Sequence, residues 1–125
     1  MKKIIQTNKA PQPIGPYSQA VLINDVLFVS GQIAINPETN NLSMDNIIEE
    51  TNQVMKNLGE ILKAAGYSYE HIVKTTIFLK DLNDFVRVNE VYGSFFKSDF
   101  PARETVQVSR LPKDVNVEIS VIASK

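Results

Sequence analysis

The chain has 125 residues, of which 43% are hydrophobic, and this length and composition predict a single domain over residues 1–125. The 13 Lys and Arg residues nearly balance the 14 Asp and Glu residues, so the composition predicts no basic surface for nucleic acid or for a membrane. With no cysteine and one histidine, disulfides, a thiolate nucleophile and the usual zinc sites are excluded, and we expect no metal site.

The N-terminal stretch MKKIIQTNKAP has no apolar run of the kind found in signal peptides, so we expect a cytoplasmic protein without a membrane segment. Residues 2–6 predict a short edge strand. Three prolines (Pro11, Pro13 and Pro16) then predict an irregular loop that exposes Tyr17. Residues 18–23 and 26–31 alternate around Asn24-Asp25, which is typical of a hairpin.

Two amphipathic helices are expected in the middle of the chain, separated by a strand. The turn-rich segment 33–43 predicts a loop before the first helix. The stripe of the first helix consists of Ile47, Ile48, Thr51, Met55, Leu58, Ile61, Leu62 and Ala65, and Gly66 ends it. Residues 72–80 alternate as a strand. Asp81 or Asn83 can cap the second helix, whose stripe is Phe85, Val88, Tyr92, Phe95 and Phe96.

Two alternating runs near the C-terminus contain the residues best suited to chemistry. Residues 103–109 alternate between a polar set that includes Arg103 and a set dominated by valines, and residues 115–122 place Glu118 opposite an apolar face. A short polar loop joins the runs, so we expect an antiparallel pair of neighbouring strands. Matching their apolar faces to one core predicts that Arg103 and Glu118 share the other face of the sheet.

The predicted order is β-β-β-α-β-α-β-β, with one apolar stripe per helix and one apolar face per strand. This pattern predicts an α+β fold with two layers, a six-stranded sheet and two helices on one face. The other face would contain Phe78, Thr105, Gln107, Asn116 and Ser120. This set is too polar for a second core, so either water or a partner subunit could cover it.

Glu118 has two interpretations. It can simply face water, or pair with Arg103 or Lys113 at little energetic gain, as most strand carboxylates do. Alternatively, Arg103 binds a substrate carboxylate through its planar fork of donors while a partly desolvated Glu118 moves protons for a water molecule. His71 is interpreted as structural, and Tyr17 by default as a packing aromatic.

Residues 101–119 read P-A-R-x-x-V-x-V-x-R-L-P-K-D-V-x-V-E-I, a pattern that closely resembles the signature of the reactive intermediate deaminase family, also called the RidA or YjgF family. The segments I-G-P-Y at residues 14–17 and V-S-G-Q-I at residues 29–33 also resemble it. The resemblance covers nearly the whole chain. It implies a chorismate-mutase-like fold with a mixed sheet, and a homotrimer whose sheets face inward and whose sites lie between subunits.

The resemblance also implies an activity in metabolite damage control. Family members hydrolyse the 2-imino and enamino acids released by pyridoxal-phosphate dehydratases, such as 2-iminobutanoate and 2-iminopropanoate, to 2-oxo acids and ammonia without a cofactor. By resemblance, Arg103 would bind the carboxylate and Glu118 would activate water. The substrate pocket would be lined by Tyr17, Ser30, Gly31, Asn89, Arg103 and Thr105.

Two positions depart from the family pattern, because Thr105 stands where a cysteine is common and Glu104 where a small residue is usual. Two alternatives remain beside the deaminase. The first is a non-catalytic regulatory protein that binds small carboxylates, against which Glu118 argues. The second is a ribonuclease or translation inhibitor, against which the pI of about 5.8 argues.

A covering subunit is also expected on physical grounds. A site in the middle of an open sheet face would attract a carboxylate by only about 1 kcal/mol, because bulk water screens the charges. Both helices are committed to the opposite face, and no other segment is long enough to form a lid. We therefore expect a second copy of the chain to cover the site.

Overall fold

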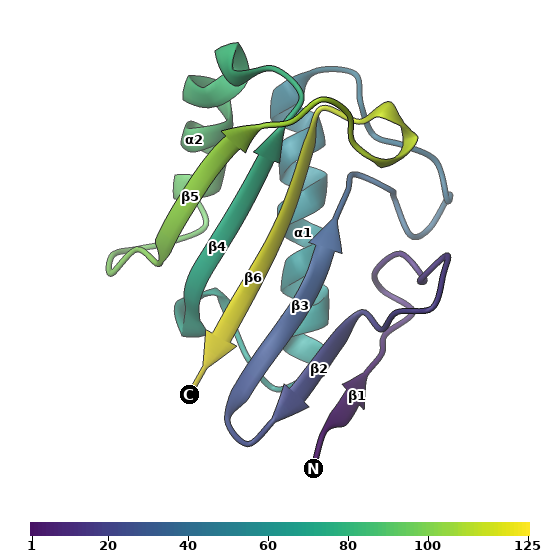
Figure 1. The fold of residues 1–125 in the computed structure, drawn as a ribbon, viewed down its shortest axis with the longest axis vertical. Coiled ribbons are helices and arrows are strands. Elements are labelled where there is room, and N and C mark those ends of the chain that lie inside the picture. The colour runs from purple at the N-terminus through teal and green to yellow at the C-terminus, as the bar shows by residue number, and fades with distance from the viewer.

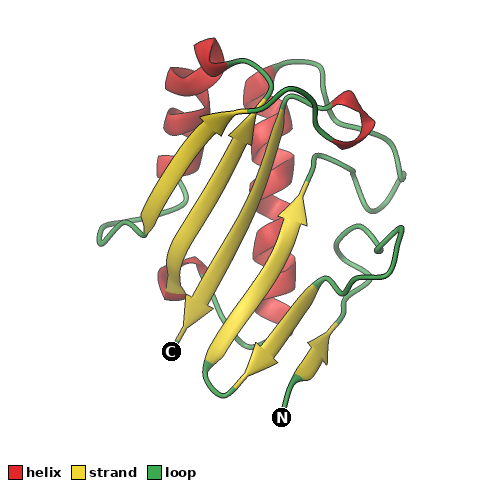
Figure 2. Ribbon diagram, in the orientation of Figure 1, coloured by secondary structure: helices red, strands yellow, loops and turns green.

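A six-stranded sheet forms one layer of the computed structural model, which describes residues 1–125, and two helices form the other (Figures 1 and 2). The strands are β1 (Lys3–Ile5), β2 (Ala20–Ile23), β3 (Val26–Gln32), β4 (Ile72–Leu79), β5 (Ala102–Gln107) and β6 (Val117–Ser124). The helices are α1 (Ile47–Ala64) and α2 (Phe85–Gly93). The predicted α+β architecture and the predicted order of elements are confirmed.

The strands lie in the order β1-β2-β3-β6-β4-β5. β4 and β5 are parallel, and every other neighbouring pair is antiparallel, so the sheet is mixed. The prediction that residues 103–109 and 115–122 form neighbouring strands is wrong, because β4 lies between β5 and β6. The reason is the connection through α2, a crossover long enough to place β5 parallel to β4 at the edge of the sheet.

α1 covers the middle of the sheet behind β3 and β6 (Figure 1). Its N-terminus is capped by Asn46, whose Oδ1 accepts a hydrogen bond of 2.9 Å from the Glu49 amide. Gly66, at φ +81°, follows its end in a conformation that other residues adopt only with strain. The buried face includes Val54, Met55, Leu58, Ile61 and Leu62. Ile48, expected in this stripe, instead is 43% exposed.

α2 is shorter than its expected stripe. It ends at Gly93, so Phe95 and Phe96 follow the helix, although both pack against the core. Asp81 does not cap α2 directly; it caps the 3-10 turn that precedes α2 by accepting a 2.9 Å hydrogen bond from the Asn83 amide. Phe85 is partly exposed beside the edge of the sheet.

The register decides which side chains share a face. Thr75 of β4 is buried on the helix side and pairs with Arg103 of β5, whereas Phe78 pairs with Glu118 of β6. Since paired residues project to the same side, Arg103 lies on the helix side and Glu118 on the open side. The prediction that they share one face is therefore wrong.

Thr105 and Gln107 also lie on the helix side, opposite to their predicted face, because they pair with the buried Ile77 and Leu79. The error arose from assigning the valines of β5 to the core. β5 is an edge strand, and Val106 is 42% exposed on the open face. On the helix side, Arg103 donates a hydrogen bond to Asn89 of α2 and Gln107 accepts one from the Leu82 amide, so polar side chains are tolerated there.

The open face of the sheet carries a row of apolar side chains. Ile4, Val21, Phe28 and Ile122 are successive partners across β1, β2, β3 and β6. Ile4 is 52% exposed and Phe28 is 46% exposed. Both helices lie behind the sheet, and no element of the chain covers this face (Figure 2). Exposed apolar rows of this kind are common where proteins associate.

Candidate functional site

Arg103 is held on β5 by contacts with α2. Its Nη1 donates a 2.7 Å hydrogen bond to Oδ1 of Asn89. The guanidinium carbon lies 5.6 Å from the ring centroid of Phe85 and 5.2 Å from that of Tyr92, which is within the range of cation–π attraction. No carboxylate of the chain pairs with Arg103. The contacts therefore orient the guanidinium while leaving donors free for a ligand.

A cleft of about 470 Å³ opens beside this arginine. It is lined by Asn89, Tyr92, Gly93, Phe100, Pro101 and Arg103. The Tyr92 hydroxyl donates a 2.9 Å hydrogen bond to Oγ1 of Thr75. Burial raises the pKa of Tyr92, against smaller lowering effects of Thr75 and of the Arg103 charge, so this hydroxyl stays neutral. The Arg103 cleft thus combines one cation with neutral polar and aromatic walls.

Thr105 follows Arg103 by two residues on the same side of β5. Its Oγ1 is buried and has no hydrogen-bond partner, the single buried side-chain polar atom in this condition. Leaving such a group unpaired costs free energy, and a polar group bound beside it would recover that cost.

Glu118 projects from the opposite face of the sheet. It is partly buried, and burial raises the pKa of its carboxyl above the ordinary value of 4.5. It makes no ion pair, so neither Arg103 nor Lys113 neutralises it as the alternative interpretation supposed. An unpaired carboxylate with a raised pKa has the properties of a general base.

Gly31 makes room for this carboxylate. A Cβ atom on Gly31 would lie 2.2 Å from Oε2 of Glu118, a distance that no real contact allows. β3 carries an extra residue here, because Val29 pairs with Val121 and Gln32 with Ile119, and such a bulge redirects the strand locally. The glycine and the bulge together place the β3 backbone beside Glu118.

Ser30 and Tyr17 belong to the same half of the site. The Ser30 hydroxyl donates a 2.6 Å hydrogen bond to the carbonyl of Ser18, which ties β3 to the residue that follows Tyr17. Tyr17 itself is 51% exposed, and its hydroxyl accepts a long hydrogen bond of 3.5 Å from the Ile14 amide. The packing role considered for Tyr17 therefore does not apply within one chain.

The predicted site residues thus form two groups. Asn89, Arg103 and Thr105 lie on α2 and β5, whereas Ser30, Gly31 and Glu118 lie on β3 and β6, and Tyr17 lies on the loop that Ser30 bonds at Ser18. β4 separates β5 from β6, so Arg103 and Glu118 lie on strands about 10 Å apart, and their side chains project from opposite faces. One chain does not bring Arg103 and Glu118 onto one small molecule.

The aromatic support of Arg103 was not predicted. Phe85 and Tyr92 were assigned to the core stripe, yet their rings also contact the guanidinium. The signal was the spacing of Phe85, Asn89 and Tyr92 at i, i+4 and i+7, which aligns them on one side of a helix. Phe100, another lining residue of the cleft, gave no such signal.

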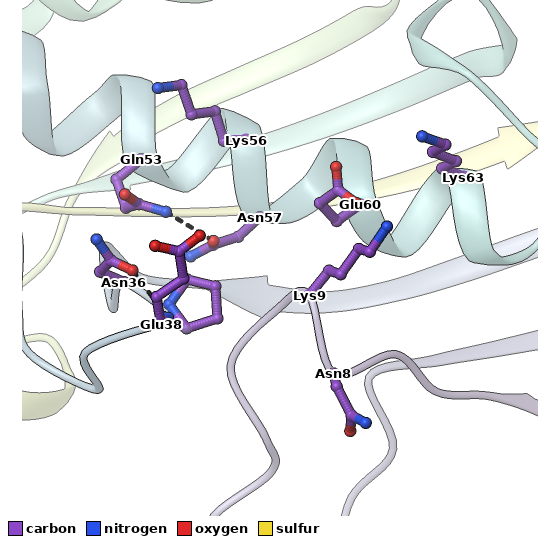
Figure 3. A pocket seen from close by; sticks show the side chains of 10 residues that line it. Asn8, Lys9, Asn36, Glu38, Gln53, Lys56, Asn57, Glu60 and Lys63 are labelled. Atoms are coloured by element: carbon purple, nitrogen blue, oxygen red, sulfur yellow. Dashed lines mark hydrogen bonds between the residues drawn. The ribbon is translucent and has the colours of Figure 1, made fainter.

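A larger groove of about 630 Å³ lies elsewhere, against the exposed side of α1 (Figure 3). It is lined by Asn8, Lys9, Asn36, Pro37, Glu38, Gln53, Lys56, Asn57, Glu60 and Lys63. Lysines and glutamates are mixed within it, and Gln53 and Asn57 are hydrogen-bonded to each other. All its buried polar side chains have partners, so this groove shows the features of a solvated surface.

Two further features are negative. No group of three or more His, Asp or Glu side chains is arranged to hold a metal ion. Neither α1 nor α2 combines the length and the apolar character needed to cross a membrane.

Comparison with known proteins agrees with the fold and the sequence pattern. A family model described as Endoribonuclease L-PSP matches residues 7–125. A RutC family protein of Saccharolobus solfataricus is 54% identical over 125 residues, covering 100% of this chain and 99% of the relative. The human 2-iminobutanoate/2-iminopropanoate deaminase is 50% identical over 123 residues, covering 98% of this chain and 90% of the human protein.

Solved structures give the same result. The structure of Escherichia coli TdcF with bound serine has a TM-score of 0.95 and 44% identity, and the match covers 98% of each chain. A Rid family protein of unknown function from Yersinia pestis has a TM-score of 0.97 and 49% identity, with full coverage of both chains. The family model, these relatives and the similar solved structures agree, and the chain belongs to the Endoribonuclease L-PSP family, which includes the RidA and YjgF proteins.

Proposed function

We propose that this protein is a cytoplasmic deaminase that hydrolyses 2-imino acids such as 2-iminobutanoate and 2-iminopropanoate to 2-oxo acids and ammonia. One observation carries the proposal: Arg103 and Glu118 are both without an ionic partner in the chain, and burial raises the pKa of the Glu118 carboxyl. Relatives at about 50% identity that bear the deaminase name support it.

The chemistry divides between the two groups of residues. Arg103 would bind the substrate carboxylate with the donors that Asn89 leaves free, which fixes the imine carbon in place. Glu118 would accept a proton from a water molecule as the water oxygen bonds to the carbon of the protonated imine, which gives a carbinolamine. Glu118 would return that proton to the amine nitrogen and then accept the hydroxyl proton as the carbonyl forms and ammonia leaves. No cofactor is needed, because an imine is already electrophilic, and such acid–base help contributes about 10²–10⁴-fold.

We also propose that the active form is a homotrimer whose sites lie between chains. The position of Arg103 and Glu118 on opposite faces of one sheet supports this assembly, since a neighbouring copy could place its Arg103 edge against the Glu118 face. The exposed apolar row on the open face supports it as well. Light scattering should then give about three times the chain mass of 14.0 kDa.

Two other functions are less well supported. The endoribonuclease named in the family description would need a surface for a polyanion, and the net charge of −1 does not favour one. A carboxylate-binding regulator would need Arg103 and would have no use for a desolvated, unpaired Glu118. Neither function is favoured by a specific feature of this chain.

The test is a coupled assay. A threonine dehydratase releases 2-iminobutanoate, and the rate of 2-oxobutanoate formation is followed with and without this protein. We expect acceleration by the wild type and strongly reduced acceleration by Glu118→Gln. A folded wild-type protein that leaves the rate unchanged would refute the proposed function.

A further inference from the structure

Glu50 is a fully buried carboxylate that the proposed chemistry does not use. It lies in the first turns of α1, is 0% exposed and has no Lys, Arg or His partner. Burying a charge without a cation is costly unless hydrogen bonds compensate for the lost water. Hydrogen bonds within the protein must therefore stabilise the buried Glu50 carboxylate.

The compensation comes from the entry to β6. Oε2 of Glu50 accepts hydrogen bonds from the backbone amides of Asn116, at 2.8 Å, and Val117, at 3.2 Å. Oε1 accepts a third, at 2.7 Å, from Nδ2 of the Asn116 side chain. One carboxylate of α1 thus binds the two residues that immediately precede Glu118.

The segment that Glu50 binds lies between a turn with unfavourable backbone angles and the end of β4. It leaves a turn in which Lys113 and Asp114 both have positive φ, at 55° and 56°, a conformation that costs free energy for residues other than glycine. On its other side, the Asn116 carbonyl accepts a 3.0 Å hydrogen bond from the Lys80 amide. The start of β6 is therefore fixed between α1 and the end of β4.

The position of this segment matters for Glu118 because the fit around that carboxylate is close. Gly31 has no space for a Cβ beneath Oε2, so a small displacement of β6 changes the distance between the Glu118 carboxylate and the β3 backbone. A misplacement of about 1 Å in a catalytic group can lower a rate about 100-fold.

We propose that Glu50 is a positioning residue for Glu118, anchoring the start of β6 to α1 so that the Glu118 carboxylate stays seated over Gly31. The expected effect on kcat rests on the proposed deaminase function. The expected effect on the position of the Glu118 carboxylate does not. Arg103 lies on another strand and on the other face, so substrate anchoring should not depend on Glu50.

The kinetic test compares Glu50→Ala with Glu50→Gln and with Glu49→Ala, a control at the adjacent exposed position. We expect Glu50→Ala to lower kcat by at least about tenfold with KM changed less than about twofold. Glu50→Gln should recover most of kcat, because its oxygen accepts the two backbone bonds and the Asn116 amide can turn to accept from its nitrogen. Glu49→Ala should match the wild type.

A double substitution separates positioning from general destabilisation. In a Glu118→Gln background, Glu50→Ala should cause little further loss of kcat, because the group it positions is already removed. An equal fold-loss in both backgrounds, or a wild-type kcat for Glu50→Ala, would overturn the proposal. If Glu50→Ala does not fold, Asn116→Ala, which removes only the 2.7 Å side-chain contact, replaces it in the same cycle.

An NMR titration of the Glu118 carboxyl tests the same proposal without any activity. In the wild type its midpoint should lie above the ordinary glutamate value, and Glu50→Ala should shift it back toward that value as water reaches the loosened strand. An unchanged midpoint in folded Glu50→Ala would overturn the positioning role. An inactive wild type in which this shift occurs would instead refute only the proposed deaminase function.

Discussion

Replacing Arg103 by alanine should remove the anchor for the substrate carboxylate. The guanidinium is oriented by Asn89 at 2.7 Å and by two aromatic rings, so it offers a preorganised fork rather than a mobile charge. Two charge-assisted hydrogen bonds of about 1.5–3 kcal/mol each would be lost, which corresponds to roughly 10²- to 10⁴-fold in kcat/KM. Arg103→Lys should recover only part of this loss, because an ammonium cannot form the bidentate contact.

The assay is the coupled formation of 2-oxobutanoate, with circular dichroism to verify folding. Arg87→Ala serves as the matched control, since Arg87 lies on α2 and forms a surface ion pair with Asp84. Such pairs contribute only about 0–1 kcal/mol, so this variant should keep wild-type kinetics. A folded Arg103→Ala protein with wild-type kcat/KM would refute the assignment of Arg103 as the anchor.

Three further predictions concern the Glu118 half of the site. As pH is lowered, kcat/KM should fall with a midpoint above pH 4.5, because activity is lost when Glu118 is protonated and burial raises the pKa of this carboxyl. A midpoint at or below pH 4.5 would contradict this. Gly31→Ala should lower kcat at least about tenfold by displacing the Glu118 carboxylate, and wild-type turnover would exclude that contact. The raised pKa means that folding stability falls as pH rises through the interval between the unfolded and folded pKa values of Glu118. Glu118→Gln should therefore raise Tm at pH 7, and an unchanged or lower Tm would contradict this reasoning.

The sequence predicted the elements better than their arrangement. The stripe of α1 and the alternation of β6 are local patterns, and both are confirmed apart from Ile48 and the extent of α2. Strand neighbours are not local: the short polar loop before β6 favoured a hairpin with β5, but β4 occupies that position. Only the crossover through α2 reveals this, and the sequence does not show where a crossover returns.

Local sequence patterns were also insufficient to predict the geometry of the site. Alternation correctly separated Arg103 from Val106 on β5, yet it could not decide which set faces the helices, because an edge strand need not bury its valines. The error reversed the geometry and placed Arg103 beside Glu118 on one face. The role of Gly31 and the carboxylate of Glu50 also escaped prediction, since each depends on contacts between segments far apart in the chain.

In the proposed trimer, each site combines Arg103 of one chain with Glu118 of another. Arg103→Ala and Glu118→Gln chains, each nearly inactive alone, can be co-expressed with different tags and purified as mixed assemblies. Every mixed ring of three contains one neighbouring pair in which an intact Arg103 meets an intact Glu118, so about one third of the sites in the purified mixed trimers would be complete. We predict recovery of about one third of wild-type activity on this basis. Mixed assemblies no more active than the two variants alone would contradict a site shared between chains.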